Sequence, residues 1–416
     1  MGTWRGTVKS FLILLAGEGA ARALGLFSVV LLARALGPHG FGPVVFATSL
    51  LAWFWLVVDN GTQVAATPDI ARDPSTFAPA VQRVLGLRIV LGLGAAAALV
   101  LAAQLASNTE TSAQVYSLFA IALPFAALNP RWMALGVGES RLLALGNVAG
   151  QAAVLVGVVV LVHDDLDLNR VPFIVAAGEL TFALVLLGGL APRFGLLLPC
   201  VDIASWRRTL RKGVPLMVGS ASRGALLSFD LLVIVYAIGP GAAGYYGAAV
   251  KPVLFAGTAA GMFALSLLAS YSAASGDAAL QLYRRAARSA AAVAIVAAVC
   301  LALGAGLLVD VVYGDEFDPA ATVLAILALR IPFMALSGVY SSVLIAGGGQ
   351  VQLMQNNIAG AAVNVVGVLA AVKLAGIEGA AAVSVLSAVV ILVLNVRSAT
   401  RSGLVPGFHT AVRAPW

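Results

Sequence analysis

Residues 89–109 read IVLGLGAAAALVLAAQLASNT and hold no charged side chain. An α-helix needs roughly 20 predominantly apolar residues to cross a hydrocarbon core of about 30 Å. Charge-free runs of similar length recur at 142–162, 252–276 and 289–309. These runs predict an all-α polytopic membrane protein.

The composition of the whole chain supports this class. Of its 416 residues, 61% are hydrophobic and only 10% are charged, and the mean hydropathy is +1.00. Soluble domains carry about 25% charged residues. The two cysteines are far apart and form no disulfide or zinc pattern, so we expect Cys200 to be a surface thiol and Cys300 a small buried residue. We expect no metal site and no cofactor.

A pass along the chain predicts twelve transmembrane helices. The apolar run 331–372 is twice the length of one span and is interrupted at Gly347-Gly348-Gly349-Gln350, which predicts a helical hairpin there. The expected spans are 11–33, 41–59, 83–106, 114–136, 142–163, 171–191, 213–237, 244–271, 289–310, 320–346, 353–372 and 377–397.

The distribution of lysine and arginine predicts the orientation, because cytoplasmic loops carry an excess of these residues. With twelve spans, both termini lie on one side, and that side collects seventeen of the 25 basic residues. They are Arg5, Lys9, Arg72, Arg83, Arg88, Arg141, Arg193, Arg207, Arg208, Arg211, Lys212, Arg284, Arg285, Arg288, Arg397, Arg401 and Arg413. The opposite side receives only Arg34, Arg170 and Lys373. Both termini are therefore expected in the cytoplasm, and the net charge of +7 is a topology signal that argues against nucleic acid as a partner.

A repeat relates the two halves of the chain. Leu36-Gly37-Pro38-His39-Gly40-Phe41-Gly42 follows the first expected helix, and Ile238-Gly239-Pro240-Gly241-Ala242-Ala243-Gly244 follows the seventh. Asn147-Val148-Ala149-Gly150 is similarly matched by Asn357-Ile358-Ala359-Gly360. Six spans per copy give both copies the same orientation, which predicts two six-helix bundles related by a pseudo-twofold axis along the membrane normal.

This division sets the expected domains. Residues 1–197 form the N-terminal bundle, 198–212 a cytoplasmic linker and 213–416 the C-terminal bundle. The linker segment 207–212 is basic and follows Trp206. It either forms a surface that attracts anionic lipid, or is a solvated loop whose positive charge only reflects its cytoplasmic location. We favour the second from sequence.

Several of these motifs resemble a known family. The stretch Ala33-Arg34-Ala35-Leu36-Gly37-Pro38-His39-Gly40-Phe41-Gly42 resembles the opening signature of polysaccharide-exporting flippases of the Wzx type, which belong to the multidrug/oligosaccharidyl-lipid/polysaccharide (MOP) exporter superfamily. The resemblance continues at Asp59-Asn60-Gly61, Ile70-Ala71-Arg72-Asp73-Pro74, Pro215, Asp230, Gly244-Tyr245-Tyr246 and Tyr313-Gly314-Asp315-Glu316-Phe317. Two departures, Ile238 in the second copy and Pro43 where the family often has tyrosine, leave the substrate class open.

The resemblance implies a fold like that of the MATE transporters and a flippase function. Such a protein moves an undecaprenyl-diphosphate-linked oligosaccharide from the inner to the outer leaflet of the bacterial cytoplasmic membrane, by alternating access. Its partners would be that substrate, membrane lipids and other polysaccharide assembly proteins. The resemblance also implies that the first and seventh helices line the central cleft.

Ionisable residues inside spans are costly, and each is therefore a functional hypothesis. Cations outnumber acids, which suits an anionic cargo, and a guanidinium can bond two phosphate oxygens at once. The candidate substrate-binding residues are Arg22, Arg131, Arg223, Lys251 and Arg330, and the candidate ion-coupling residues are Glu18 and Asp230. Glu179 is the third acid within a span.

The alternative role for these charges is structural pairing between helices. Glu18 and Arg22 are four residues apart and share a helix face, as do Arg223 and Asp230 at a spacing of seven. Lys251 and Arg131 lie beside prolines. As an alternative to a role in substrate binding, their long side chains would extend to the membrane interface.

Two other functions compete with the flippase. A small-molecule antiporter of the same superfamily would favour acids in its cavity, whereas this chain has more cations. A membrane enzyme, such as a polysaccharide polymerase or glycosyltransferase, needs a large external loop or an acidic cluster, and the loops here are short. The chain also lacks a Gly-x-x-x-x-Gly-Lys-[Ser/Thr] motif, so we expect no P-loop ATP hydrolysis and no enzyme activity.

Overall fold

The computed structural model describes residues 4–59, 77–106, 110–195, 198–273 and 276–404. Within these ranges every regular element is a helix and none is a β-strand, which confirms the predicted all-α class. In chain order the elements are α1 (Trp4–Asp59), α3 (Phe77–Ala106), α4 (Glu110–Leu118), η2 (Phe119–Ile121), α5 (Ala122–Ala127), α6 (Arg131–Gly136), α7 (Ser140–Leu161), η3 (Asp165–Arg170), α8 (Val171–Phe194), α9 (Ile203–Ala237), α10 (Pro240–Ala273), α11 (Gly276–Leu303), α12 (Ala305–Val312), η4 (Asp315–Phe317), α13 (Pro319–Ala328), α14 (Arg330–Ala346) and α15 (Gln350–Arg401).

A helical segment lies at each of the twelve predicted spans. Eight helical stretches in the described ranges are long and apolar enough to cross a membrane. Two of these stretches, in α1 and α15, each contain two helices joined at a corner, one at Gly37 and the other at Ala375-Gly376. Helices α9 and α10 cover the seventh and eighth spans. The predicted hairpin is also present, because α14 ends at Ala346 and α15 begins at Gln350.

The repeated Gly-Pro motif forms the same kind of corner in both halves of the chain. Gly37 has a φ of 59° and Gly239 a φ of 127°, backbone angles that residues with a Cβ atom rarely adopt. Each glycine is followed by a proline, and Pro240 is the first residue of α10. Proline favours the first turn of a helix because its missing N–H needs no partner there. The motif therefore ends one helix and begins the next.

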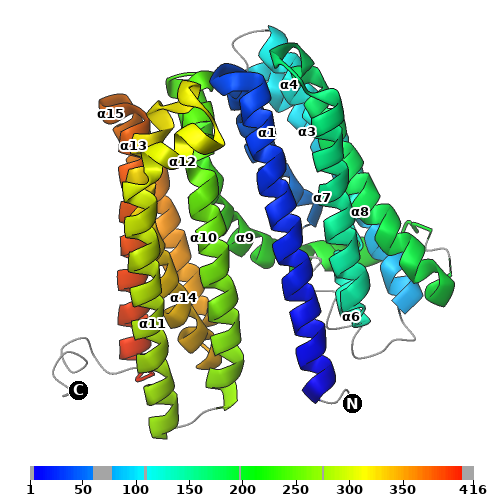
Figure 1. Ribbon diagram of the computed structural model, residues 1–416. Coiled ribbons are helices and arrows are strands. Elements are labelled where there is room, and N and C mark those ends of the chain that lie inside the picture. The colour runs from blue at the N-terminus through cyan, green and yellow to red at the C-terminus, as the bar shows by residue number, and fades with distance from the viewer. Residues whose placement is uncertain (1–3, 60–76, 107–109, 196–197, 274–275, 405–416) are drawn as a thin grey trace. The chain divides into compact units, whose positions relative to one another are not determined.

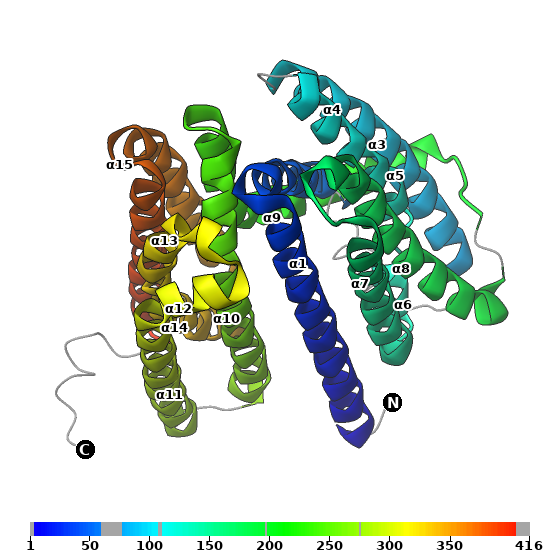
Figure 2. The same cartoon turned by 45° about the horizontal axis from the view of Figure 1, so that its top comes forward.

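The chain divides into two compact units, Met1–Ala221 (unit 1) and Ser222–Trp416 (unit 2). In unit 1, α1 packs along α7 and against α3, and α7 packs along α8 (Figure 1). In unit 2, α14 contacts α10, α11 and α15, and the short helix α12 packs against α13 (yellow in Figure 2). Each unit is thus a helical bundle with its own packed interior.

The second sequence repeat marks equivalent close contacts. Gly150 lies on α7 where it meets α8, and a Cβ at this position would lie 3.0 Å from the Gly178 carbonyl oxygen. Gly360 lies on the first helix of α15, and a Cβ there would overlap Ile391 on the second. Small residues allow this approach of helix backbones, which is the main packing device inside membranes.

Large apolar side chains cover the outside of both units, as lipid-facing surfaces require. Leu105 is 79% exposed and Leu303 is 85% exposed. Cys300 lies on the same outward face of α11 as Val296 and is exposed, so the expectation of a buried Cys300 was wrong. The exposure of Cys200 confirms the predicted surface thiol.

Candidate functional site

Three polar side chains of unit 1 meet around the carboxylate of Glu18, and we call these four residues the Glu18 cluster. Arg22 lies 3.0 Å from Glu18 Oε1, and Arg131 lies 3.5 Å from Glu18 Oε2. The Asn147 amide donates a hydrogen bond of 3.2 Å to the same Oε2. One acid therefore holds two guanidinium groups and one amide from three different parts of the unit.

Helix packing brings these residues together. Gly17 has no side chain, and a Cβ at its position would overlap Ala144, so α1 lies directly against α7. This contact places Glu18 beside Asn147, which is one turn further along α7. Arg131 begins α6, and its backbone N–H donates to Asn129 Oδ1 at 3.0 Å. The Asn129-Pro130 sequence thus fixes the helix start from which Arg131 reaches Glu18.

The Glu18 cluster is cationic and accessible. Counted over the described residues, its two arginines and one glutamate leave an excess of one positive charge. The side chain of Arg22 is 48% exposed, that of Arg131 36% and that of Glu18 27%. A guanidinium that bonds one carboxylate retains further N–H donors, because arginine has five. The cluster can therefore accept an anionic group without first being dismantled.

A second charged group of unit 1 is buried, and the sequence did not reveal it. Arg88 is 0% exposed and forms an ion pair of 2.9 Å with Asp59. Its guanidinium also donates to the Ala127 carbonyl at 3.1 Å, and it interacts electrostatically with Glu179 of α8. The sequence assigns Arg88 to the cytoplasmic side, and within that expectation the structure buries its side chain between α3 and α5. An acid at the end of one predicted span, Asp59, was the available signal for a partner.

Unit 2 contains a buried group that we call the Asp230 cluster. The Tyr246 hydroxyl donates to Asp230 Oδ2 at 2.5 Å, and Arg330 donates to the Ser384 hydroxyl at 3.1 Å. Arg330 attracts the Asp230 carboxylate, and Ser384 and Asn364 also interact with it. All five side chains are buried, with Asp230 4% exposed and Arg330 7%. The cluster joins α9, α10, α14 and both helices of α15.

Lys251 lies in α10 directly before Pro252, and no ion pair to it occurs among the described residues. Pro252 has no N–H for the Ala248 carbonyl one turn earlier. The Tyr313 hydroxyl supplies the missing donor at 3.2 Å. Burial raises the pKa of Tyr313 to about 12, so this hydroxyl keeps its proton at neutral pH. The break in the α10 ladder beside Lys251 is thereby satisfied from the Tyr313-Gly314 segment.

The structure brings some of the predicted site residues together and separates others. Arg22, Arg131 and Glu18 form one cluster, and Arg330 and Asp230 form another. Arg223 lies in α9, but its side chain is outside the described residues. Asn147 and Tyr246 were not predicted as site residues, although both occur in quoted motifs.

The fold is similar to that of several solved transporters. It superposes on a lipid II flippase MurJ in an inward closed conformation with a TM-score of 0.78, at 12% identity, over 94% of this chain and 87% of that one. An inward-facing multidrug resistance MATE family transporter of the MOP superfamily gives a TM-score of 0.75 at 14% identity, over 94% and 98% of the two chains. A MOP superfamily transporter from Pyrococcus furiosus gives 0.61 at 14% identity, over 95% and 96%.

These likenesses establish the fold, and the family follows from sequence. No curated protein matches the chain. A family model described as polysaccharide biosynthesis protein matches residues 7–271, which is more than half of the chain. The chain therefore belongs to the polysaccharide biosynthesis protein family.

Proposed function

We propose that this protein is a flippase that moves an undecaprenyl-diphosphate-linked oligosaccharide from the inner to the outer leaflet for cell-surface polysaccharide biosynthesis. It would reside in the bacterial cytoplasmic membrane with both termini in the cytoplasm, and would work by alternating access of a cationic cavity. The Glu18 cluster carries this proposal, because it places two accessible guanidinium groups on apolar, membrane-spanning segments.

The chemistry of the cargo fits such a cluster. A diphosphate headgroup is strongly anionic, and its transfer through the bilayer needs positive groups at membrane depth, whereas the prenyl tail can stay in lipid. Arginine binds phosphate oxygens in a planar, two-pronged arrangement. Arg22 and Arg131 would engage the diphosphate, while Glu18 and Asn147 hold the two guanidinium groups near one another.

The remaining predicted residues have different standing in this proposal. Arg330 is engaged inside the Asp230 cluster, and we propose that it acts there as a structural partner as well as a candidate ligand. Lys251 supplies a cation of unit 2 with no acidic partner among the described residues. Arg223 stays in the proposal on its sequence position alone.

An ion-coupled small-molecule antiporter is the second candidate. Its supporting observation is the buried carboxylate of Asp230, since acids at membrane depth are candidates for cation or proton coupling. The electrostatic attraction between Asp230 and Arg330 weighs against that role, because the carboxylate already has a nearby counter-charge.

The test is translocation of a labelled undecaprenyl-diphosphate-oligosaccharide in liposomes that contain the purified protein. Arg22→Ala and Arg131→Ala should each slow flipping by roughly ten- to a hundredfold, which corresponds to one lost charge-assisted hydrogen bond. Arg193→Ala is the matched control, because Arg193 forms a similar pair with Glu139 at 3.3 Å on an exposed surface.

Three outcomes separate the possibilities. Loss of flipping in the two cluster variants alone supports the flippase and its site. Equal flipping by all variants retains the flippase but removes the Glu18 cluster from the path. No flipping by the native protein with lipid-linked glycans from its host favours the antiporter and directs the search to ion-coupled export.

A further inference from the structure

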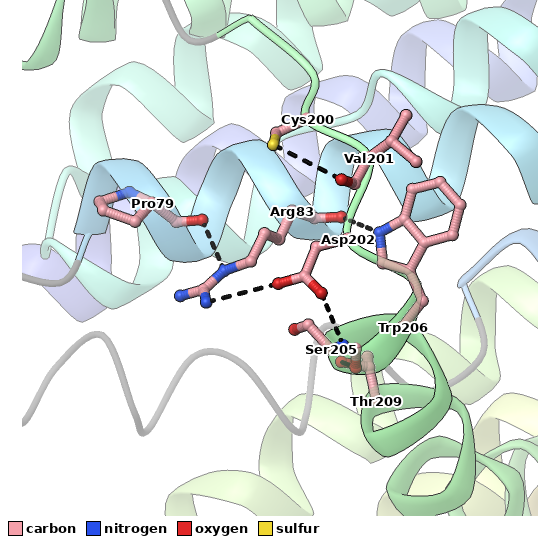
Figure 3. A network of polar contacts seen from close by, with 8 residues as sticks. All are labelled: Pro79, Arg83, Cys200, Val201, Asp202, Ser205, Trp206 and Thr209. Atoms are coloured by element: carbon pink, nitrogen blue, oxygen red, sulfur yellow. Dashed lines mark hydrogen bonds and ion pairs between the residues drawn. The ribbon is translucent and has the colours of Figure 1, made fainter.

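The segment that follows α8 is fastened to α3 of unit 1 by specific contacts. The Cys200 N–H donates to the Gln82 carbonyl at 2.9 Å, and the Trp206 indole N–H donates to the Arg83 carbonyl at 2.9 Å. Figure 3 shows the Arg83 side chain between the Pro79 carbonyl and the Asp202 carboxylate, with the Trp206 indole reaching its carbonyl.

Two further features make this attachment close and ordered. A Cβ on Gly86 would overlap the Cys200 carbonyl oxygen, so only glycine at this position allows the segment to lie directly on α3. Asp202 accepts a hydrogen bond of 3.0 Å from the Ser205 N–H and thereby caps the start of α9. The orientation of the first turns of α9 is therefore set by unit 1.

The side of this segment turned away from α3 is apolar and cationic. Leu198, Val201 and Ile203 are 61%, 73% and 73% exposed. In the first turns of α9, the side chains exposed together are Arg207, Arg208 and Arg211. At about 100° per residue these three fall within an arc of roughly 100°, opposite the face that carries Trp206. No ion pair to them is found in the described part of the chain.

We propose that residues 198–211 form a docking surface for anionic phospholipids of the cytoplasmic leaflet, in which Arg207, Arg208 and Arg211 bind headgroup phosphates. The three exposed apolar side chains would enter the acyl boundary, as in interfacial amphipathic segments. Basic residues beside a span attract anionic lipid, and a face held rigidly by α3 loses little entropy on binding. A lipid-bound segment differs from the solvated linker that we favoured from the sequence alone.

The native thiol of Cys200, within this segment, provides a local reporter. Cys200 and Cys300 are the only cysteines, so Cys300→Ala leaves Cys200 as the single labelling site. A solvent-sensitive fluorophore on Cys200 is read in nanodiscs of phosphatidylcholine, with and without phosphatidylglycerol, with iodide as an aqueous quencher. Added phosphatidylglycerol should shield the probe at least several-fold from iodide, and high salt should reverse the shielding.

Three sets of variants give the controls. Arg207→Gln, Arg208→Gln and Arg211→Gln combined should abolish the response to phosphatidylglycerol. The same three positions changed to lysine should retain most of it, which keeps the test valid if the glutamine variant folds poorly. Arg284→Gln, Arg285→Gln and Arg288→Gln remove the same charge from α11 and should leave the response at Cys200 unchanged.

The outcomes decide the proposal. Shielding that depends on phosphatidylglycerol and on the three linker arginines supports it. A response that survives their replacement by glutamine, or that falls equally in the α11 variant, overturns it. Shielding by inorganic phosphate in phosphatidylcholine nanodiscs would instead assign a site for free anions. Flipping is measured separately, so failure here leaves the flippase proposal intact.

Discussion

The two units share their backbone corners but differ in how they hold charge. In unit 1 the Glu18 cluster is partly exposed, and its described members carry one surplus positive charge. In unit 2 the Asp230 cluster is almost fully buried, with one arginine for one aspartate. Both clusters involve the helix that precedes a Gly-Pro corner.

This difference separates two uses of ionisable residues in a membrane. A buried, balanced pair joins helices and is expensive to break, because a lone charge remains without water. A half-exposed, unbalanced group contributes little to stability and is available to a ligand. Residue type alone does not distinguish Arg22 from Arg330; exposure and charge balance do.

The largest effect expected is the loss of one partner in the Asp230 cluster. Arg330→Met should lower the free energy of unfolding by about 3–5 kcal/mol, because it leaves the Asp230 carboxylate buried without its counter-charge. Arg22→Met in the Glu18 cluster should cost less than about 1 kcal/mol. Denaturant unfolding in detergent measures both, and Arg88→Met serves as a positive control because it breaks the buried pair with Asp59.

A second result would refine this prediction. The double variant Asp230→Asn with Arg330→Met should recover part of the lost stability, since no buried charge remains. If the two units respond equally to loss of arginine, the proposed contrast between them is wrong.

Removal of a neutral partner should have a smaller effect. Tyr246→Phe deletes the hydroxyl that donates to Asp230 and should destabilise the protein by about 1–3 kcal/mol, the typical cost of an unsatisfied buried acceptor. Thermal unfolding checks it. Tyr245→Phe is the neighbouring control, and a loss of equal size there would contradict a specific role for Tyr246.

The shared corners predict equal responses in the two units. Gly37→Ala and Gly239→Ala should each destabilise by about 1–2 kcal/mol, because both glycines have positive φ. Gly188→Ala, in the interior of α8 with no atom close to a new Cβ, should instead be neutral or stabilising. If the two substitutions lowered the free energy of unfolding by different amounts, the two corners would not contribute equally to stability.

Within the Glu18 cluster, binding should change more than stability. Glu18→Gln removes the acid of the cluster as the described residues form it, so the free energy of unfolding should shift by less than about 1 kcal/mol while undecaprenyl diphosphate binds more tightly. Equilibrium binding to the purified protein measures the change, with Glu139→Gln as the exposed control. Weaker binding would mean that the carboxylate is needed to position the two arginines.

The smallest effect expected concerns acids outside the spans. Asp310 in unit 2 is exposed, and desolvation together with repulsion from Asp318 and Asp315 raises its pKa, so its ionised form disfavours the folded state at neutral pH. Asp310→Asn should therefore raise Tm slightly at pH 7, and the gain should vanish below about pH 4, where the carboxyl is protonated in both states.

An acid in the η3 segment of unit 1 should behave in the opposite way. Asp167 pairs with Arg170 at 2.7 Å and accepts a hydrogen bond from the His163 N–H at 3.0 Å. Asp167→Asn should lower Tm at pH 7. Thermal unfolding over a pH series measures both variants. A change in Tm of the same sign for Asp310→Asn and Asp167→Asn would contradict the opposite roles given to these two acids.

The sequence predicted the local features of this fold well. Span positions follow from charge-free length, and the corners at Gly37 and Gly239 follow from Gly-Pro chemistry. The pair of Glu18 with Arg22 follows from its spacing of four residues. Contacts between distant segments were not predictable, because Asn147 and Arg131 reach Glu18 only through the packing of Gly17 on Ala144. The burial of Arg88 was missed for the same reason.

The corner at Gly37 also bears on how the chain enters the membrane. Since Pro38 begins the second helix directly after the turn, α1 holds two spans with almost no loop between them. The polar groups that must cross the hydrocarbon during insertion are then mainly the Arg34 and His39 side chains and the few backbone groups of the turn. Two helices with satisfied backbones can enter as a preformed hairpin, and the second copy at Gly239-Pro240 gives α9 and α10 the same route.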